Sequence, residues 1–285
     1  MRTLFALSLA GILGFAASLP RARERSFSFE YAVTVKDIPT GAHAVDVWLP
    51  EPRNDAYQRI TDLHIDSPYR HETATGSEGN RIVHIRLAHP TQPSFTVTMR
   101  FDALRRERFQ PVDEPPAESS SALPPDLARY LRPDRLVPLD DTIRKWAREV
   151  ADAARCGNCT DFHAIFIGCA RAVGIPARFA IGFPLPADRG AGKISGYHCW
   201  AAFYAKGIGW VPVDASEAAK NPAKREYFFG HHDENRVKFG KGRDVELVPK
   251  QHGAPLNYFV YPHVEVDGGE YTALETSYSY KDLPL

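Results

Sequence analysis

Hydrophobic and polar residues alternate strictly along several runs in the N-terminal third of the chain. The first run extends from Phe27 to Val35, with a bulky apolar side chain at every second position, and the same period recurs at residues 45–49, 83–87 and 95–101. A period of two is typical of β-strands that have one buried and one exposed face. Turn-forming residues separate the runs, so the pattern predicts an antiparallel β-sandwich-like domain over residues 26–106.

The pattern changes after a proline-rich stretch. Residues 107–138 contain many prolines and a serine run at 119–121, which favours a linker or wrapping arm at a domain boundary. Beyond it, apolar residues recur at helical spacing from Ile143 to Ala154. Asp140 or Asp141 can cap this helix, which we expect to extend to about Arg155.

A second, nearly all-apolar helix is predicted to start at Cys159. Gly174 and Pro176 follow it in the order that is usual after a helix end. We expect this helix to be buried on several sides, because apolar side chains fill most of its faces. Its most regular stripe consists of Phe162, Phe166, Cys169 and Val173.

Strands are predicted after this helix at residues 178–183, 197–205 and 210–214, with a closing strand at 257–266. Helices followed by an antiparallel sheet predict an α+β domain, to which we assign residues 139–285. The segment 217–249 is polar and irregular, and we interpret His231, His232 and its basic residues as solvated surface. These basic residues are Lys220, Lys224, Arg225, Arg236, Lys238, Lys241 and Arg243.

The first residues have the form of a secretory signal peptide. One arginine precedes the uncharged stretch Leu4 to Ala17, which is short for a membrane span, and small residues follow it. We therefore expect a signal peptide at residues 1–19, a periplasmic or secreted protein, and no stable membrane insertion after signal removal. The 35 basic and 35 acidic residues balance to a formal net charge of zero, so we expect no nucleic-acid partner.

The strongest chemical signal is the cysteine at the start of the second helix. A helix N-terminus presents unpaired N–H groups and the positive end of the helix dipole. These features lower the pKa of a thiol and can stabilise a developing oxyanion. Cys159 is therefore the candidate nucleophile.

His198 begins one predicted strand and Asp214 ends the next. A symmetric tight turn would put Ala201 opposite Asp214 and leave His198 on the other face. A three-residue loop, Lys206 to Ile208, shifts the pairing by one and brings His198 diagonal to Asp214, within side-chain reach. With that loop, Asp214 can hold one imidazole nitrogen and orient the other toward Cys159.

Four segments occur in a fixed order: Gly157-Asn-Cys-Thr-Asp161, Arg171-Ala-Val-Gly-Ile-Pro-Ala-Arg178, Tyr197-His-Cys-Trp200 and Gly209-Trp-Val-Pro-Val-Asp214. Together they resemble the transglutaminase-like superfamily, a papain-like group that includes animal transglutaminases, peptide N-glycanases and many bacterial proteases. The resemblance covers about residues 140–216, and residues 228–244 resemble the tail of bacterial members that have a signal peptide. It implies a papain-like core in which Cys159 is the nucleophile, His198 the general base and acid, and Asp214 the orienting carboxylate.

The resemblance also implies an activity. A protein or peptide amide would acylate the cysteine, and water or an amine would then release the thioester. The similarity to bacterial members favours hydrolysis, by a protease or amidase, over cross-linking. No cofactor and no metal is expected for this chemistry.

The chain departs from the family pattern at two points. Most members carry a small residue after the histidine, where this chain has Cys199. A tryptophan or glutamine upstream of the cysteine often supplies an oxyanion donor, but Trp146 lies on the apolar stripe and is interpreted as a core residue. Asn158 is either a donor or a turn residue, and the backbone N–H of Cys159 is the favoured donor.

Two other classes of function stay open. Cys156 and Cys159 form a Cys-x-x-Cys motif, which suits a thiol–disulfide oxidoreductase or a reversible disulfide that caps the nucleophile. The sandwich domain could instead serve a catalytically inactive binding module. A zinc site is disfavoured because there is no second Cys-x-x-Cys motif, and His163 and His198 lack the usual zinc spacing.

Overall fold

The structure is a computed structural model that describes residues 22–110, 123–143 and 158–285. The predicted signal peptide and Cys156 lie outside the described residues, as does most of the helix expected to end near Arg155. That helix does begin as expected, because the Asp140 carboxylate accepts a hydrogen bond from the backbone N–H of Ile143 at 2.9 Å. Within the described ranges, no helix is long and apolar enough to cross a membrane.

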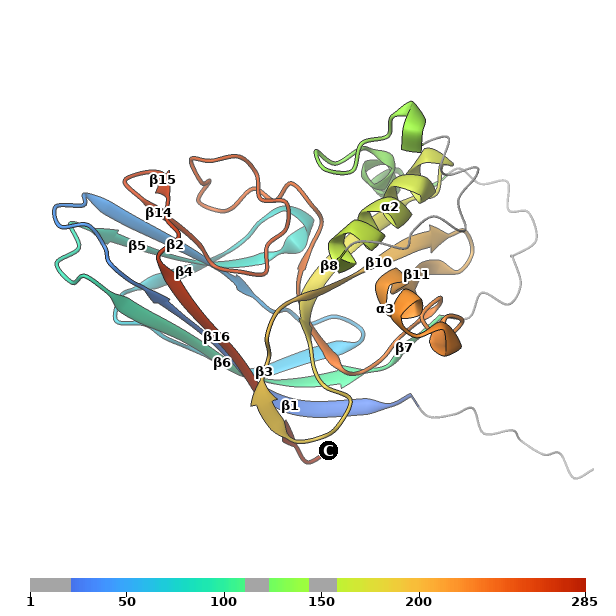
Figure 1. The fold of residues 1–285 in the computed structure, drawn as a ribbon, viewed down its shortest axis with the longest axis horizontal. Helices are drawn as coiled ribbons and strands as arrows, with labels where there is room; N and C mark the ends of the chain where they lie inside the picture. Colours follow the sequence, from blue (N-terminus) through green and yellow to red (C-terminus); the bar gives the residue numbers. More distant parts are fainter. Residues whose placement is uncertain (1–21, 111–122, 144–157) are drawn as a thin grey trace, which may run out of the picture.

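Two five-stranded antiparallel sheets make up one half of the molecule (Figure 1). The first has the order β3-β6-β1-β16-β9 and the second the order β15-β14-β2-β5-β4. The alternating runs of the sequence form the long strands, and every second side chain of β1 is buried. The bounds are β1 Glu24–Val35, β2 Ala44–Glu51, β3 Gln58–Asp66, β4 His71–Thr75, β5 Arg81–Ala88, β6 Phe95–Arg106, β9 Ala191–Lys193, β14 His263–Val266, β15 Gly269–Glu270 and β16 Leu274–Leu283.

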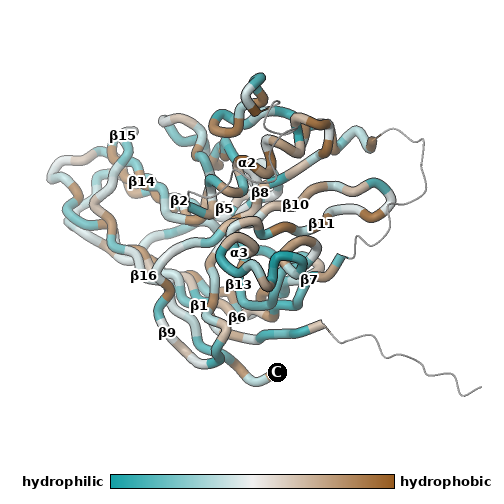
Figure 2. Tube along the Cα trace, turned by 45° about the vertical axis from the view of Figure 1, so that its right-hand side comes forward, coloured by the Kyte–Doolittle hydropathy of each residue, from teal (hydrophilic) through white to brown (hydrophobic). Residues whose placement is uncertain are grey.

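A four-stranded antiparallel sheet with the order β11-β10-β8-β13 makes up the other half. Helix α2 (Cys159–Ala172) lies across β10 and β8 (Figure 1), and hydrophobic residues recur along α2 and these strands (Figure 2). The α+β architecture expected for this part of the chain is confirmed. The remaining elements are β7 Arg108–Phe109, β8 Ala177–Pro184, β10 His198–Ala205, β11 Gly209–Val213, β12 His231–His232, β13 Arg236–Lys241, α3 Ala215–Lys220, and the short 3-10 helices Ser77–Gly79, Pro125–Leu131 and Pro222–Lys224.

One hydrophobic core joins the two halves. Phe183 of β8 and Phe239 of β13 pack against Phe29 of β1, with ring centroids 5.5 and 5.7 Å from Phe29. These residues belong to a single cluster of buried side chains that extends from the first sheets to the sheet under α2. The sheet that carries His198 is therefore packed directly against the sandwich.

Strand pairing runs across the predicted domain boundary. The division into residues 26–106, 107–138 and 139–285 stays a prediction, but β14 pairs with β2 and β16 pairs with β1. The last strands of the chain thus complete the sheets that its first strands begin. The predicted closing strand is shorter than expected and starts at His263, and a turn with positive φ at Asp267 and Gly268 follows it.

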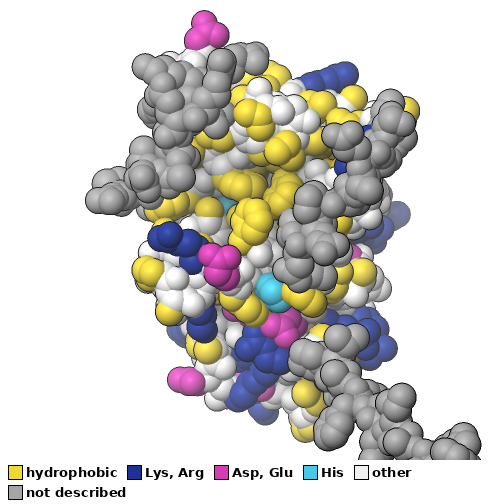
Figure 3. All heavy atoms as spheres, turned by 90° about the vertical axis from the view of Figure 1, so that its right-hand side faces the viewer, with side chains coloured by type: hydrophobic (Ala, Val, Ile, Leu, Met, Phe, Trp, Pro, Cys, Tyr) yellow, Lys and Arg dark blue, Asp and Glu magenta, His cyan; other side chains and the backbone are white. Residues whose placement is uncertain are grey.

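The buried face of α2 is not the stripe expected from the sequence. Thr160, His163, Ile167 and Arg171 face the core, whereas Val173 is exposed and the rest of the predicted stripe is only partly buried. Polar side chains occupy the buried face because they find hydrogen-bond partners there, as described below. Figure 3, which views the molecule from the side of α2 and β11, shows apolar side chains on the surface.

Removal of the Phe183 ring is expected to destabilise both halves together. Phe183 is completely buried, so Phe183→Ala should lower the free energy of unfolding by about 3–5 kcal/mol through lost burial and a cavity. Urea unfolding followed by circular dichroism and by tryptophan fluorescence measures this change. The control Leu136→Ala, at a side chain with 53% exposure, should stay within about 0.5 kcal/mol of the wild type. A loss below about 1 kcal/mol for Phe183→Ala would contradict the shared core.

Candidate active site

Cys159 is the first residue of α2, at a helix start that is held by a capping box. The Asn158 side chain accepts hydrogen bonds from the backbone N–H groups of Thr160 and Asp161, at 2.8 and 3.3 Å. The Asp161 carboxylate in turn accepts from the backbone N–H of Asn158 at 2.9 Å. Of the two roles left open for Asn158, the structure supports the turn residue. The cap fixes the thiol at the positive end of the helix.

The hairpin that brings His198 to Asp214 has the predicted register. Ala201 pairs with Val213 and Ala205 with Gly209, so the loop consists of Lys206 to Ile208. The three-residue loop is thereby confirmed. His198 Nε2 lies 2.7 Å from a carboxylate oxygen of Asp214, which leaves Nδ1 as the nitrogen that can bond the thiol.

The thiol and the imidazole shift each other's ionisation. A hydrogen bond with the Cys199 thiol lowers the pKa of Cys159 to about 4, and the hydrogen bond and charge of His198 add to this effect, although burial opposes it. Burial alone would lower the pKa of His198, but Asp214 and the Cys159 thiolate raise it to about 9. Between these values the pair is a thiolate and an imidazolium, the reactive form of a cysteine nucleophile.

Asp214 is completely buried, and each of its two carboxylate oxygens accepts two hydrogen bonds. One oxygen accepts from the Ser216 hydroxyl at 3.2 Å and from the Glu217 backbone N–H at 3.1 Å, which caps α3. The other oxygen bonds His198 and Arg236 Nη1, the latter at 2.9 Å. Burial would raise the pKa of this carboxyl group, but His198 and Arg236 hold it well below its usual range.

His163 is a residue of the site that the sequence analysis did not assign. Its ring is completely buried, with Nδ1 at 2.6 Å from the Cys159 carbonyl oxygen and Nε2 at 3.1 Å from the Ala215 backbone nitrogen. The Ala215 N–H can only donate, so Nε2 accepts and Nδ1 carries the hydrogen. Burial lowers the pKa of His163, which keeps the ring neutral. His163 thus ties the first turn of α2 to the residue that follows Asp214, and its position four residues after Cys159 is the signal that could have revealed it.

Cys199 also reaches the site. Its buried sulfur lies 3.5 Å from His163 Nδ1 and 3.9 Å from the Thr160 hydroxyl oxygen, and Cys199 is the largest cause of the lowered pKa of the Cys159 thiol. The departure from the family pattern at this position therefore puts a second thiol beside the candidate nucleophile.

Part of the segment 217–249 was wrongly interpreted as solvated surface. Arg236, Arg243 and His232 are buried, and Lys238 forms an ion pair with Asp55. Arg236 pairs with both Asp214 and Asp233, and Arg243 donates to the Thr160 carbonyl oxygen at 3.1 Å. Charge in a polar segment suggests exposure, but these side chains find buried acceptors that are distant in sequence.

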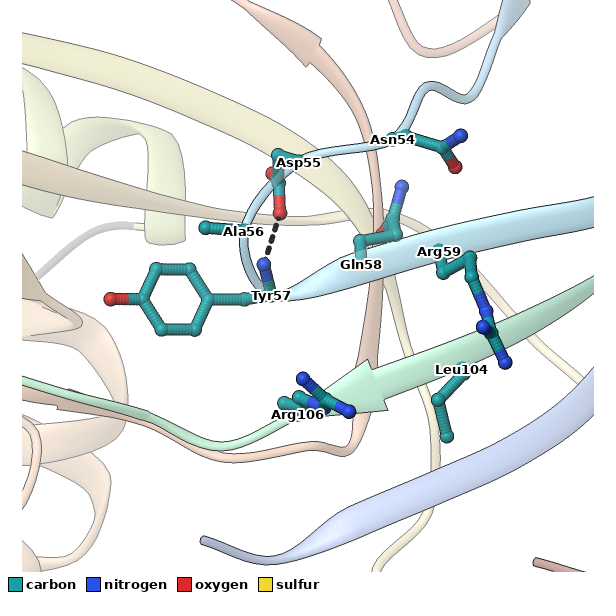
Figure 4. A pocket seen from close by; sticks show the side chains of 8 residues that line it. All are labelled: Asn54, Asp55, Ala56, Tyr57, Gln58, Arg59, Leu104 and Arg106. Atoms are coloured by element: carbon teal, nitrogen blue, oxygen red, sulfur yellow. Dashed lines mark hydrogen bonds between the residues drawn. The ribbon is translucent and has the colours of Figure 1, made fainter.

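The Cys-x-x-Cys alternative stays a prediction, because Cys156 lies outside the described residues. Cys159, Cys169 and Cys199 are free thiols. In the part of the chain that the structure covers, no three histidine, cysteine or acidic residues are grouped as metal ligands. A pocket at the turn before β3 is lined by residues such as Tyr57, Arg59 and Arg106 and has neither thiol nor imidazole (Figure 4). That pocket therefore offers no nucleophile of the cysteine type.

Comparisons with known proteins place this chain among relatives of known sequence and fold. Residues 128–215 match the model of the family described as the Transglutaminase-like superfamily, and this segment includes Cys159, His198 and Asp214. An uncharacterized protein of Haemophilus influenzae is 26% identical, and the alignment covers 98% of each protein. A solved structure from Cytophaga hutchinsonii, named a "Putative Cysteine Protease", has a TM-score of 0.57 at 15% identity over 92% of this chain and 99% of that chain. That likeness shows a common fold.

Removal of the buried arginine should destabilise the site. Arg236→Gln would leave the Asp214 charge partly uncompensated, and we expect the free energy of unfolding at pH 7 to fall by about 3–5 kcal/mol. The folded-state pKa of Asp214 is depressed, so its contribution to stability is present above the unfolded-state value of about 3.9 and is lost as the pH falls through the lower folded value.

The difference between wild type and Arg236→Gln should therefore narrow below about pH 4. Urea unfolding at several pH values measures it. The exposed Arg225 offers a matched control, since Arg225→Gln should change stability by no more than about 0.5 kcal/mol. Equal stabilities for the two variants would contradict the role assigned to Arg236.

Proposed function

We propose that this protein, whose residues 128–215 form a transglutaminase-like core, is a cysteine enzyme that acts on protein or peptide amide bonds through Cys159, His198 and Asp214. The observation that carries the proposal is an imidazole that a buried carboxylate holds at 2.7 Å and that helps to lower the pKa of a thiol at a helix start. A signal-peptide pattern at residues 1–19 supports an activity in the periplasm or outside the cell.

In the first half-reaction the Cys159 thiolate attacks the carbonyl carbon of an amide, and a carbon–sulfur bond forms. The oxyanion receives a hydrogen bond from the backbone N–H of Cys159, which has no acceptor inside the helix. His198, as imidazolium, donates its proton to the leaving nitrogen, and the carbon–nitrogen bond breaks. A thioester and a free amine result.

In the second half-reaction water attacks the thioester and gives its proton to His198. The carbon–sulfur bond breaks, the acid leaves, and the thiolate is restored. We propose hydrolysis in preference to cross-linking. The partial exposure of the Cys159 side chain supports this choice, since water can approach the sulfur.

Loss of the sulfur should abolish turnover. Cys159→Ala is expected to lower the rate by about 10⁴-fold or more, because the covalent step needs the thiolate. We would measure ammonia release from a glutamine-containing peptide and cleavage of a γ-glutamyl-lysine isopeptide, with circular dichroism as the test of folding. Cys169→Ala, on the same helix, is the matched control and should retain activity. Equal rates for wild type and Cys159→Ala on both probes would refute the proposed nucleophile, and faster capture by an added amine than by water would refute hydrolysis.

The pH profile should have two limbs. Activity should fall below about pH 4 as the thiolate gains a proton, and above about pH 9 as His198 loses its proton. Both pH values describe the coupled titration of Cys159 and His198, not the titration of either residue alone. Asp214→Asn should move the alkaline limb to lower pH, because the carboxylate raises the pKa of His198. Alkylation of Cys159 by iodoacetamide as a function of pH checks the acid limb without substrate. A single transition near the ordinary thiol value of about 8.5 would contradict the ion pair.

A further inference from the structure

We propose that Cys199 is a resolving cysteine, which converts a peroxide-oxidised Cys159 into a reversible Cys159–Cys199 disulfide. The inference rests on the proposed function only in that both need a reactive thiolate at Cys159. It assigns a role to a buried thiol that the amide chemistry does not use.

The position of Cys199 is set by the alternation of β10. Neighbouring residues of a strand point to opposite faces, and Cys199 points toward α2, where it contacts Thr160 and His163. His163 Nδ1 lies 3.5 Å from the Cys199 sulfur and 2.6 Å from the Cys159 carbonyl oxygen, so both cysteines meet the same imidazole nitrogen. Cys199 therefore faces Cys159 across the interface between α2 and β10, and the pKa of the Cys159 thiol responds to it, which fits the proximity that a disulfide needs.

The two sulfurs differ in access and in ionisation. Cys159 is partly exposed and is favoured as a thiolate, whereas Cys199 is completely buried, and burial together with the Cys159 charge raises the pKa of its thiol. An exposed thiolate next to a second thiol is the arrangement of a redox-sensitive cysteine pair. Peroxide would therefore react first at Cys159, and Cys199 would stay reduced until its neighbour changes.

The chemistry balances in two steps. The Cys159 thiolate attacks an oxygen of hydrogen peroxide, the O–O bond breaks, and Cys159 becomes a sulfenic acid while hydroxide leaves. The Cys199 sulfur then attacks the Cys159 sulfur, the S–O bond breaks, and the Cys199 proton leaves with the hydroxyl group as water. The second step is helped by the first, because a neutral sulfenic acid no longer raises the pKa of Cys199 through charge. A dithiol reverses the bond by exchange.

This pair protects the nucleophile from irreversible oxidation. A sulfenic acid that meets no thiol is oxidised further to a sulfinic acid, which thiols cannot reduce. Cys169 is an unsuitable partner, since it lies ten residues further along α2, at about 15 Å, beyond the reach of a disulfide.

The experiment treats the full chain with hydrogen peroxide and maps the products by mass spectrometry of non-reduced peptides. For wild type we expect a cross-linked Cys159–Cys199 peptide, an about tenfold loss of iodoacetamide labelling at Cys159, and full recovery with dithiothreitol. Cys199→Ser should give a dimedone-trapped sulfenic acid at Cys159 and then a sulfinic acid, without recovery. Cys169→Ser is the matched control and should behave as wild type.

Two results would overturn the proposal. One is a Cys156–Cys159 cross-link in place of the Cys159–Cys199 peptide, and the other is irreversible oxidation of Cys159 in wild type. The wild-type peptide map decides even if Cys199→Ser fails to fold. None of these measurements uses turnover, so the two proposals can fail separately. A Cys159–Cys199 cross-link together with an active Cys159→Ala variant would refute the proposed function and leave this inference standing. An inactive Cys159→Ala variant without the cross-link would refute this inference and leave the proposed function standing.

Discussion

The site depends on a carboxylate that is completely buried away from solvent. Asp214 has no exposed surface, yet its surroundings keep it charged, because an imidazole, a guanidinium, a hydroxyl and a backbone N–H are directed at its two oxygens. These donors come from β10, β13 and the start of α3. One buried charge therefore fixes the relative positions of three elements, and the orientation of His198 follows from that packing. His163 adds the fourth element, since it joins α2 to the residue after the carboxylate.

The two halves of the molecule differ in how far their sequences reveal their structure. The long strands β1, β2, β5 and β6 could be predicted, since one of their faces is apolar and the alternation is visible in the sequence. Strand β3 mixes exposed and partly buried positions without that regularity, and β16 carries its buried tyrosines among polar residues. Their strand structure depends on partners that are distant in the chain, which local patterns cannot specify. The register of the β10–β11 hairpin was predictable because it is set by a short loop.

The candidate site shows the same limit at the level of single residues. Cys159, His198 and Asp214 could be named because a helix start and a hairpin bring them together through local geometry. Arg236 and Cys199 could not, because each is a polar or reactive side chain whose burial is decided by a partner on another element, and His163 had only its spacing from Cys159 as a signal. An apolar stripe on α2 was expected to face the core, but Thr160 and Arg171 face it because the core offers them acceptors. Satisfied polar groups can thus replace apolar ones at a buried face.

The pairing of β1 with β16 has a consequence for how the chain acquires its structure. Val35 pairs with Leu274, so the first long strand leaves the ribosome about 240 residues before its neighbour exists, on the order of 10–50 s at usual elongation rates. Through that interval one edge of the central strand of the first sheet offers open backbone groups to any extended segment nearby. The nascent chain is therefore vulnerable to intermolecular strand pairing until synthesis is complete, and a holding chaperone would shorten its exposure.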